Sequence, residues 1–270
     1  MKIAYSLLPD RFEDKRHETF KQGLREVGYE VVEGRAEQAG HGDLILGWNA
    51  YGTTYDQMRN ADKHGAQSMV FEEGYVRNIH GEKYFAVALG GHNGHGRWNV
   101  GGPERLAGWN LHLEPWRRHG NHILVCGQRG FGYNAMAMPT DWPDKIVGRL
   151  RTLTNRPIYF RPHPKRRATM PKSGAYDKVL DFGIDLKVQL SDAWACVVYT
   201  SNSATNALLA GVPALFDGPD IVTSPASLRG IESVDRPPLL DRTRGLQKMS
   251  WAQWSEKELR TGVAFKCLLK

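Results

Sequence analysis

The chain has 270 residues, of which 41% are hydrophobic and 24% charged, as is usual for a folded globular protein. No apolar run reaches the roughly 20 residues that span a bilayer, and the charged N-terminus does not match a signal peptide. We therefore expect a cytoplasmic protein without a membrane span. The formal net charge of +7 favours a polyanionic partner but does not identify it.

The three cysteines lie far apart in the sequence. Cys126 and Cys196 sit in apolar runs typical of buried strands, and Cys267 lies near the end of the chain. We expect buried thiols in a reducing compartment, and we predict neither a disulfide framework nor a metal site.

The first half of the chain alternates strand-like runs with helical stretches, which predicts parallel βα units. An amphipathic helix is expected at 14–27, with Phe20, Leu24 and Val27 on one face. The predicted strands cover 2–7, 29–32, 43–48 and 68–71. Residues 80–120 are rich in Gly, His, Asn and Trp and are predicted to form long functional loops.

The same alternation restarts in the second half of the chain. The predicted elements are strands at 121–127, 157–162, 193–200 and 214–216, and helices at 142–152 and 202–210. A junction near 112–122 predicts two α/β domains, residues 1–115 and 116–250, followed by an amphipathic segment at 250–269. Because ligands bind at the carboxyl ends of parallel strands, we expect a site in the cleft between the two domains.

A polar turn, Thr200-Ser-Asn-Ser, separates the strand at 193–200 from the helix that follows it. Hydroxyls and free N–H groups at the start of a helix stabilise an anion, so Thr200, Ser201, Asn202 and Ser203 are candidate phosphate-binding residues. The alternative is that Ser201 or Ser203 only caps the helix.

Two further strand-end segments of the same domain favour an anion. Arg161-Pro-His-Pro fixes His163 between two prolines, and Gly127-Gln-Arg-Gly places Gln128 and Arg129 in a glycine-flanked loop. His163 can donate a hydrogen bond to a phosphate or ribose oxygen. The cations Lys165, Arg166 and Arg167 come next, and for at least one of them a solvated surface position is expected.

Two adjacent carboxylates, Glu72 and Glu73, follow the predicted strand at 68–71. Neighbouring side chains at a strand end point to opposite sides, so one carboxylate at most faces a cleft. That carboxylate can serve as a general base toward a hydroxyl or as a nucleophile toward an anomeric carbon. For Glu72 an ion pair with Arg77 is the favoured alternative.

These segments, Glu72-Glu-Gly-Tyr-Val-Arg, Arg161-Pro-His-Pro and the turn at 200–203 with Gly211-Val-Pro, resemble the capsule-polysaccharide glycosyltransferases, which include bacterial Kdo transferases. The resemblance covers the whole chain in the same motif order. It implies a GT-B fold of two Rossmann-like domains, no metal and no cofactor besides a nucleotide-sugar donor on the C-terminal domain. A long C-terminal helix at about 251–270 would pack back on the N-terminal domain.

The resemblance also implies roles for individual residues. Glu73 is then the catalytic residue, and His163 with the turn at 201–203 binds the nucleotide. Asn206 occupies a helix position that is often Glu in such transferases. That Glu can hold the donor ribose.

The acceptor is less well defined by the sequence. The stretch from Trp116-Arg-Arg-His to Gly130, together with Trp251-Ala-Gln-Trp-Ser, resembles small proteins of bacteriophages and prophages, for which a 5-hydroxymethylpyrimidine in double-stranded DNA is the expected acceptor. Tryptophans interleaved with cations could stack an extruded base and hold its backbone. The candidate acceptor-binding residues are Arg77, Trp98, Arg117 and Arg118, with Arg97, Arg105, Trp109 and Trp116 nearby.

Four alternatives remain open at this point. Trp109 and Trp116 can pack the domain junction instead of meeting a ligand, and the acceptor can be a capsule or surface glycan with a CMP-sugar donor. The chain can also be a non-catalytic nucleotide- or DNA-binding module. A nucleotidyl or phosphoryl transferase is a weaker alternative, because neither a Walker loop nor an acidic metal cluster is present.

Overall fold

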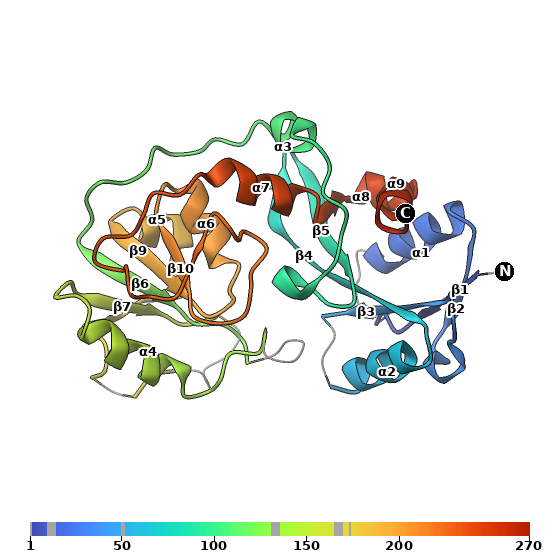
Figure 1. Cartoon of the computed structure of the whole chain (residues 1–270), viewed down its shortest axis with the longest axis horizontal. Helices are drawn as coiled ribbons and strands as arrows, with labels where there is room; N and C mark the ends of the chain where they lie inside the picture. The colour runs from blue at the N-terminus through green and yellow to red at the C-terminus, as the bar shows by residue number, and fades with distance from the viewer. Residues whose placement is uncertain (1, 10–14, 50–51, 131–135, 165–169, 173) are drawn as a thin grey trace. The chain divides into compact units, whose positions relative to one another are not determined.

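The structure, a computed structural model, describes residues 2–9, 15–49, 52–130, 136–164, 170–172 and 174–270. The chain divides into two compact units: unit 1 is Met1–Trp109 with Gln247–Lys270, and unit 2 is Asn110–Leu246. The last residues of the chain therefore belong to unit 1, and a continuous middle segment forms unit 2 (Figure 1). Among the described residues, every helix is too short or too polar to cross a membrane.

Unit 1 contains a six-stranded sheet in the order β12-β5-β4-β3-β1-β2. Its strands are β1 Lys2–Ser6, β2 Tyr29–Glu33, β3 Leu44–Trp48, β4 Gln67–Ile79, β5 Glu82–Leu89 and β12 Gln253–Ser255. Its helices are α1 Arg16–Glu26, α2 Gly52–Lys63, α3 Glu104–Trp109, α8 Glu256–Arg260 and α9 Val263–Leu268. Strands β1 to β4 pair in parallel, as the sequence predicted, whereas β5 and β12 run antiparallel.

The prediction of long loops over 80–120 is wrong for its first part, which forms strand β5. Strand β4 continues well past Phe71, turns at His80 and Gly81, and pairs back with β5. Both turn residues have positive φ, 53° and 84°, the conformation that a tight two-residue hairpin requires. The run Tyr84–Leu89 is buried throughout, so its apolar residues indicated a strand inside the Gly-rich stretch.

The C-terminal segment differs from the single long helix that the resemblance implied. It forms the short strand β12, which pairs with β5, and then the two short helices α8 and α9. Gly262, at φ 75°, separates these helices. Helix α8 contacts α1 so closely that a Cβ on Gly23 would overlap the Leu259 carbonyl, which holds this last segment against unit 1.

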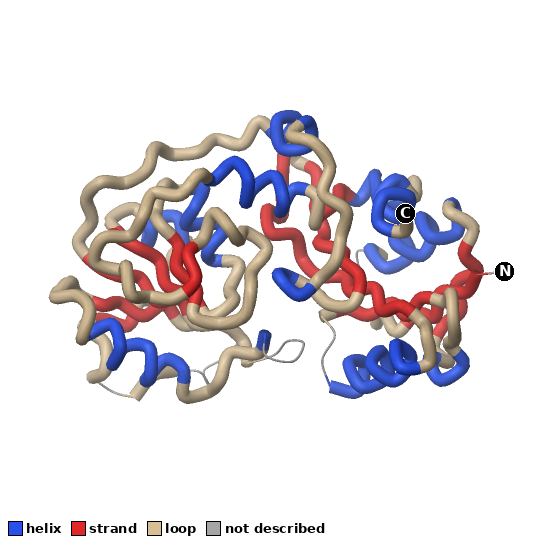
Figure 2. The backbone as a smooth tube through the Cα atoms, in the orientation of Figure 1, coloured by secondary structure: helices blue, strands red, loops and turns tan. Residues whose placement is uncertain are grey.

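Unit 2 is a parallel sheet in the order β11-β10-β9-β6-β7-β8. Its strands are β6 His122–Cys126, β7 Ile158–Arg161, β8 Lys178–Val179, β9 Ala193–Val198, β10 Ala214–Phe216 and β11 Leu228–Arg229. Its helices are α4 Trp142–Arg151, α5 Leu186–Leu190 and α6 Ser203–Leu209, and α7 Arg242–Ser250 leads from unit 2 into unit 1 (Figure 2).

The sheet of unit 2 is covered on both faces. Alternate residues of β6 enter different cores: Ile123 and Val125 pack with α4, whereas Leu124 and Cys126 pack with α5 and α6. Period-two alternation between two apolar faces is the expected pattern of a central strand in a doubly wound sheet. The strands and helices predicted for this half are confirmed, with boundaries shifted by one or two residues.

The segment that precedes β6 in unit 2 is held by backbone hydrogen bonds at the amino ends of the strands of that unit. The Glu114 and Arg117 N–H groups donate to the carbonyls of Leu209 and Gly211 at 3.0 and 2.8 Å. Gly211 has φ 71°, and a Cβ there would overlap the Pro115 carbonyl. The Gly211-Val-Pro motif therefore serves a close backbone approach at the end of α6.

We expect Gly211→Ala to lower the free energy of unfolding by roughly 2–4 kcal/mol, because left-handed backbone strain adds to the steric overlap. Gly148→Ala in helix α4 is a matched control, since nothing lies within 4 Å of its Cβ position. That variant should gain up to about 1 kcal/mol from helix propensity. Urea unfolding midpoints measure both, and equal midpoints for the two variants would contradict the proposed close contact.

Candidate functional site

The carboxyl edge of the unit 2 sheet contains a topological switch point. From β6 the chain proceeds to β7 and β8 on one side, and then to β9, β10 and β11 on the other. The loops after β6 and β9 therefore leave the sheet in opposite directions, and a crevice between such loops is the usual ligand position in doubly wound sheets. These loops contain Gln128 and the turn that begins at Thr200.

Gln128 and Thr200 join the two loops directly. The Thr200 N–H donates to Gln128 Oε1 at 2.9 Å, and Gln128 Nε2 donates to Thr200 Oγ1 at 2.8 Å. Gln128 Nε2 also donates to the Met136 carbonyl at 2.9 Å. Both ends of the Gln128 amide are thus used within the protein, so this side chain holds the switch-point loops together, and its contact with a ligand stays a prediction.

We expect Gln128→Leu to weaken nucleotide binding by about tenfold through loss of loop position. The substitution leaves the buried Thr200 N–H and the Met136 carbonyl without this partner, which costs roughly 1–3 kcal/mol of stability. Gln128→Glu keeps the acceptor for the Thr200 N–H and should recover part of both losses. Nucleotide titration and urea unfolding measure the two effects, and unchanged affinity in the Leu variant would refute a positioning role.

The serine-rich turn is half-buried and partly satisfied from within. Ser201 Oγ accepts the Ser203 N–H at 3.2 Å and contacts Ser203 Oγ at 3.1 Å. Ser201 thus satisfies the first N–H of α6 from the position before the N-cap. Asn202 is the N-cap of α6 but makes no side-chain cap bond, and the Nδ2 of the exposed Asn206 donates to the Asn202 carbonyl at 3.2 Å.

Arg161 and His163 follow β7, the neighbour of β6. The Arg161 guanidinium donates to the carbonyls of Phe182 and Ile184 at 3.2 and 3.1 Å, so it fixes the loop that leads into α5. His163 is half-buried at the same carboxyl edge, as is Arg129 after β6. The predicted charge run at 165–167 lies outside the described residues.

The two cysteines predicted to be buried are free thiols in the cores of unit 2. Cys126 and Cys196 lie on adjacent strands with their sulfur atoms 3.9 Å apart, and Cys267 of unit 1 is half-buried. Across the described ranges, no group of three or more His, Cys, Asp or Glu side chains is arranged to hold a metal ion.

Glu73 lies in unit 1 on the face of β4 that contacts α1. Its Oε1 accepts from Arg16 at 2.6 Å, and its side chain is 37% exposed. The Arg16 guanidinium lies 5.5 and 5.4 Å from the ring centres of Trp48 and Phe85. The carboxylate is thus oriented by a cation that aromatic rings hold in place.

Glu72 points to the other side of β4. In the orientation of the Asn49 amide that satisfies all its neighbours, the Asn49 nitrogen donates to the Glu72 carboxylate, and its oxygen accepts from Trp48 Nε1 at 2.8 Å. Arg77, the partner that the sequence favoured for Glu72, is exposed within the irregular stretch of β4 between Glu73 and Asn78, where the pairing register with β5 shifts. A Cβ on Gly74 would lie 2.5 Å from the Tyr84 carbonyl, so this position must be glycine.

Several residues expected to meet a DNA acceptor are used for packing in unit 1. Trp109 is buried and the Arg105 side chain is 10% exposed, and Trp98 packs against the core while its Nε1 donates to the Lys248 carbonyl at 3.1 Å. The Arg105 guanidinium lies 4.1 Å from the Trp254 ring centre. The packing alternative therefore holds for Trp109. Its ring packs edge-on against Tyr84, with the two ring centres 5.3 Å apart.

Arg117 and Arg118 lie at the amino edge of the unit 2 sheet. Arg117 donates to the carbonyl of Ser191, two residues before β9, and itself lies in the segment that leads into β6. The switch-point loops lie at the opposite end of these strands, about 17 Å away for five residues. Arg117 and Arg118 therefore lie at the edge of the unit 2 sheet opposite the switch-point loops, and their contact with an acceptor stays a prediction.

No protein-family model matches the chain, and no curated protein matches it. Among solved structures, the chain is similar to two KpsC structures from Thermosulfurimonas dismutans. The beta Kdo 2,7 transferase matches with a TM-score of 0.54 at 14% identity, covering 98% of this chain and 99% of its own. The beta Kdo 2,4 transferase matches with a TM-score of 0.60 at 14% identity, covering 93% and 91%.

At 14% identity, the similarity to these two structures shows a shared fold and nothing more. The chain has the GT-B fold. The sequence-based prediction of two Rossmann-like α/β units is thereby confirmed. Within this GT-B chain, unit 2 provides the switch-point edge with Gln128, His163 and the turn at 200–203, and unit 1 provides the Arg16–Glu73 pair.

Proposed function

We propose that the chain is a metal-independent glycosyltransferase that moves a sugar from a nucleotide-sugar to a hydroxyl acceptor. The observation that carries the proposal is the switch-point edge of unit 2, where the Gln128–Thr200 hydrogen bonds hold two polar loops together. Nucleotides bind at such positions in doubly wound sheets. The fold similarity to two Kdo transferases supports a sugar as the transferred group.

In this proposal each polar group at the unit 2 edge has a part in holding the nucleotide. Arg129, His163 and the hydroxyls of the turn at 201–203 bind the phosphate, and Asn206 donates to or accepts from a ribose hydroxyl without adding charge. Their positions at the carboxyl ends of β6, β7 and β9 support these roles. Cations and N–H donors here stabilise the nucleotide phosphate as it departs.

Glu73 is the proposed general base. It removes the proton of the acceptor hydroxyl while that oxygen attacks the anomeric carbon of the sugar. The bond from this carbon to the nucleotide phosphate oxygen breaks, and its electron pair leaves with the phosphate. Arg16 keeps the Glu73 carboxylate in one orientation during this step.

Two acceptor classes follow from different observations. A 5-hydroxymethylpyrimidine in double-stranded DNA is the first candidate, favoured by the net charge of +7 and by exposed cations on unit 2. A surface or capsule glycan, with a CMP-sugar donor, is the second and is favoured by the fold similarity to Kdo transferases. Incubation with each acceptor and one labelled nucleotide-sugar distinguishes them by which polymer gains the label.

The first test is a thermal-shift panel of UDP, CMP, GDP and ADP, each with and without its sugar. A nucleotide at about 100 times its Kd adds roughly 2.7 kcal/mol to the native state, which raises Tm by several degrees. We expect one base to give this shift in the wild type and His163→Ala to lose most of it. If no nucleotide or nucleotide-sugar of the panel raises the Tm of protein that is shown to be folded, the proposal is overturned.

A further inference from the structure

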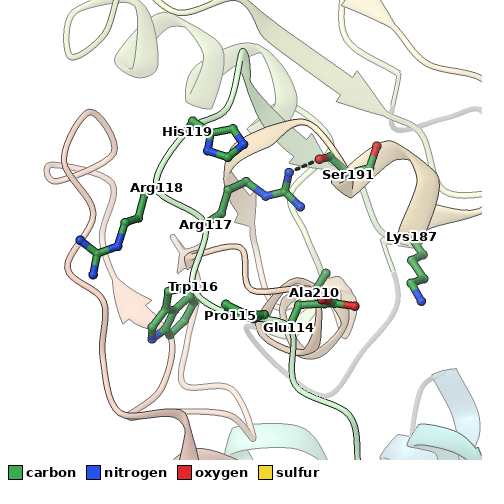
Figure 3. A pocket seen from close by; sticks show the side chains of 9 residues that line it. All are labelled: Glu114, Pro115, Trp116, Arg117, Arg118, His119, Lys187, Ser191 and Ala210. Carbon is green, nitrogen blue, oxygen red and sulfur yellow. Dashed lines mark hydrogen bonds between the residues drawn. The ribbon is translucent and has the colours of Figure 1, made fainter.

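A separate basic groove lies on unit 2, away from the switch-point loops. It has a volume of about 660 Å³ and lies between the segment before β6 and helix α5 (Figure 3). Its lining residues are Glu114, Pro115, Trp116, Arg117, Arg118, His119, Lys187, Ser191 and Ala210. Because Ser191 lies two residues before β9, this groove belongs to the amino edge of the sheet.

The groove has a fixed floor and exposed cations at its sides. Arg117 is held by the Ser191 carbonyl, and its backbone is held by Gly211. Arg118 and Lys187 are exposed, and within the described part of the chain neither makes an ion pair or a side-chain hydrogen bond. The single carboxylate of the lining, Glu114, lies 3.2 Å from the ring of His112.

The three cations of the lining favour a ligand rich in hydrogen-bond acceptors. Arg117, Arg118 and Lys187 can donate hydrogen bonds but cannot accept them. Phosphodiester oxygens only accept, whereas sugar hydroxyls also need acceptors. Trp116 offers no free platform for a sugar or a base, because Arg242 lies 4.4 Å from its ring centre and the ring also packs against the core.

The directions of the cations argue for a polymer and against a single small anion. Figure 3 shows the Arg118 and Lys187 side chains extended away from each other on either side of Arg117. An anion with repeating charges can meet cations on both sides of Arg117 at once. Duplex DNA carries one negative charge per about 1.7 Å of its axis, so its backbone satisfies this requirement without any reading of bases.

We propose that this amino-edge groove binds the phosphodiester backbone of a nucleic-acid duplex independently of base sequence. The choice of DNA as the polymer rests on the proposed function. The inference itself concerns only the binding of the duplex and not the transfer of a sugar. It assigns Arg118 and Lys187 a positioning role at a surface distinct from the nucleotide-sugar edge. Binding is therefore measured without any nucleotide-sugar, and transfer is measured separately.

The test is a titration of an unmodified duplex of about 20 base pairs, read by fluorescence anisotropy between about 50 and 200 mM salt. The groove variant is Arg118→Gln with Lys187→Gln. The control is Lys63→Gln with Arg260→Gln, two exposed unit 1 cations whose loss changes the net charge equally. All variants are full-length chains, and thermal unfolding checks that each is folded.

For the wild type we expect log K to fall linearly with log salt, and for the groove variant a slope shallower by about 1.8, because each lost phosphate contact removes about 0.9. The affinity of the groove variant at about 50 mM salt should fall by roughly 10- to 100-fold, with the control within about twofold of wild type. No wild-type binding at low salt, or equal slopes in the groove and control variants, would overturn the proposal. Tighter binding of polygalacturonate than of duplex at equal charge would assign the groove to acidic glycans and overturn it as well.

Failure of this inference and failure of the proposed function remain distinguishable. If the nucleotide panel shifts Tm but the duplex does not bind, the transferase proposal stands and the groove proposal falls. If the duplex binds through Arg118 and Lys187 but no nucleotide shifts Tm, the chain is a DNA-binding module with a GT-B fold. The groove variant should keep the nucleotide shift of the wild type, because its two residues lie at the other edge of the sheet.

Discussion

Replacing Glu73 with Gln is expected to lower kcat for sugar transfer by about 10²- to 10⁴-fold while leaving nucleotide affinity within about twofold. Gln has nearly the same shape as Glu but cannot take a proton from the acceptor hydroxyl. The nucleotide is proposed to bind unit 2, so a substitution in unit 1 should leave its Kd unchanged. Initial rates with labelled nucleotide-sugar and a nucleotide titration measure the two quantities.

Glu72→Gln is the matched control for this substitution. Glu72 is the adjacent carboxylate, but it points to the opposite side of β4 and contacts Asn49. This variant should transfer sugar at close to the wild-type rate. Normal turnover by Glu73→Gln would show that Glu73 is not the base, and loss of turnover by Glu72→Gln alone would move the role to its neighbour.

A wild-type chain that binds nucleotide but transfers no sugar to either acceptor class would support the non-catalytic alternative. The Arg16–Glu73 ion pair would then have a structural role, and Glu73→Gln would change stability without changing nucleotide binding. The exposed fraction of Glu73, 37%, predicts that this stability change is small, because partly exposed ion pairs contribute up to about 1 kcal/mol.

Replacing Arg105 with Ala is expected to destabilise the protein by roughly 2–4 kcal/mol. The Arg105 guanidinium donates to the Ser250 and Gln253 carbonyls at 2.7 and 2.8 Å and to both Glu258 oxygens at 2.5 and 2.9 Å. Its side chain is 10% exposed. Its removal leaves two carbonyls and a largely buried carboxylate without their main partner and opens space beside three tryptophans.

Arg97→Ala is the control for Arg105→Ala, since Arg97 is exposed in the same Gly- and His-rich stretch. It should change the free energy of unfolding by less than about 0.5 kcal/mol. Urea unfolding of both variants gives the comparison. Equal stabilities would contradict the structural role of Arg105 and return it to the set of residues available for a ligand.

The effect of Arg105→Ala should depend on pH through Glu258. Burial alone raises the pKa of Glu258, but the hydrogen bonds and charge of Arg105 and the Ser255 N–H outweigh it and bring the pKa below 4.5. A carboxyl with a lowered pKa in the folded state stabilises the fold above its unfolded pKa, and this contribution is lost as pH falls. The stability difference between wild type and variant should therefore be larger at about pH 7 than at about pH 4. An unchanged difference would contradict this linkage.

The part of the candidate site that lies at the strand ends of unit 2 was predictable, because the local pattern of apolar and polar residues determines where strands end. Strand ends in unit 2 are visible as apolar runs that stop at Gly127, Pro162 and Thr200, and parallel βα order brings the carboxyl ends of such strands to one edge. Polar residues placed directly after these runs had to gather at that edge. The apolar run Tyr84–Leu89 also carried a strand signal, but the surrounding glycines concealed it.

What the sequence by itself determined is therefore the alternation of strands and helices, the parallel sheets and the polar residues at the strand ends. Tertiary structure alone decided that Arg105 packs inside unit 1, that Gln128 joins two loops and that Arg117 donates to the Ser191 carbonyl. The partners of Arg105 lie about 150 positions along the chain, in a segment that returns to unit 1 only after unit 2 is complete. An arginine that packs among tryptophans and one that faces solvent have the same local sequence signature, because long-range chain pairing, not local periodicity, determines which cations remain exposed.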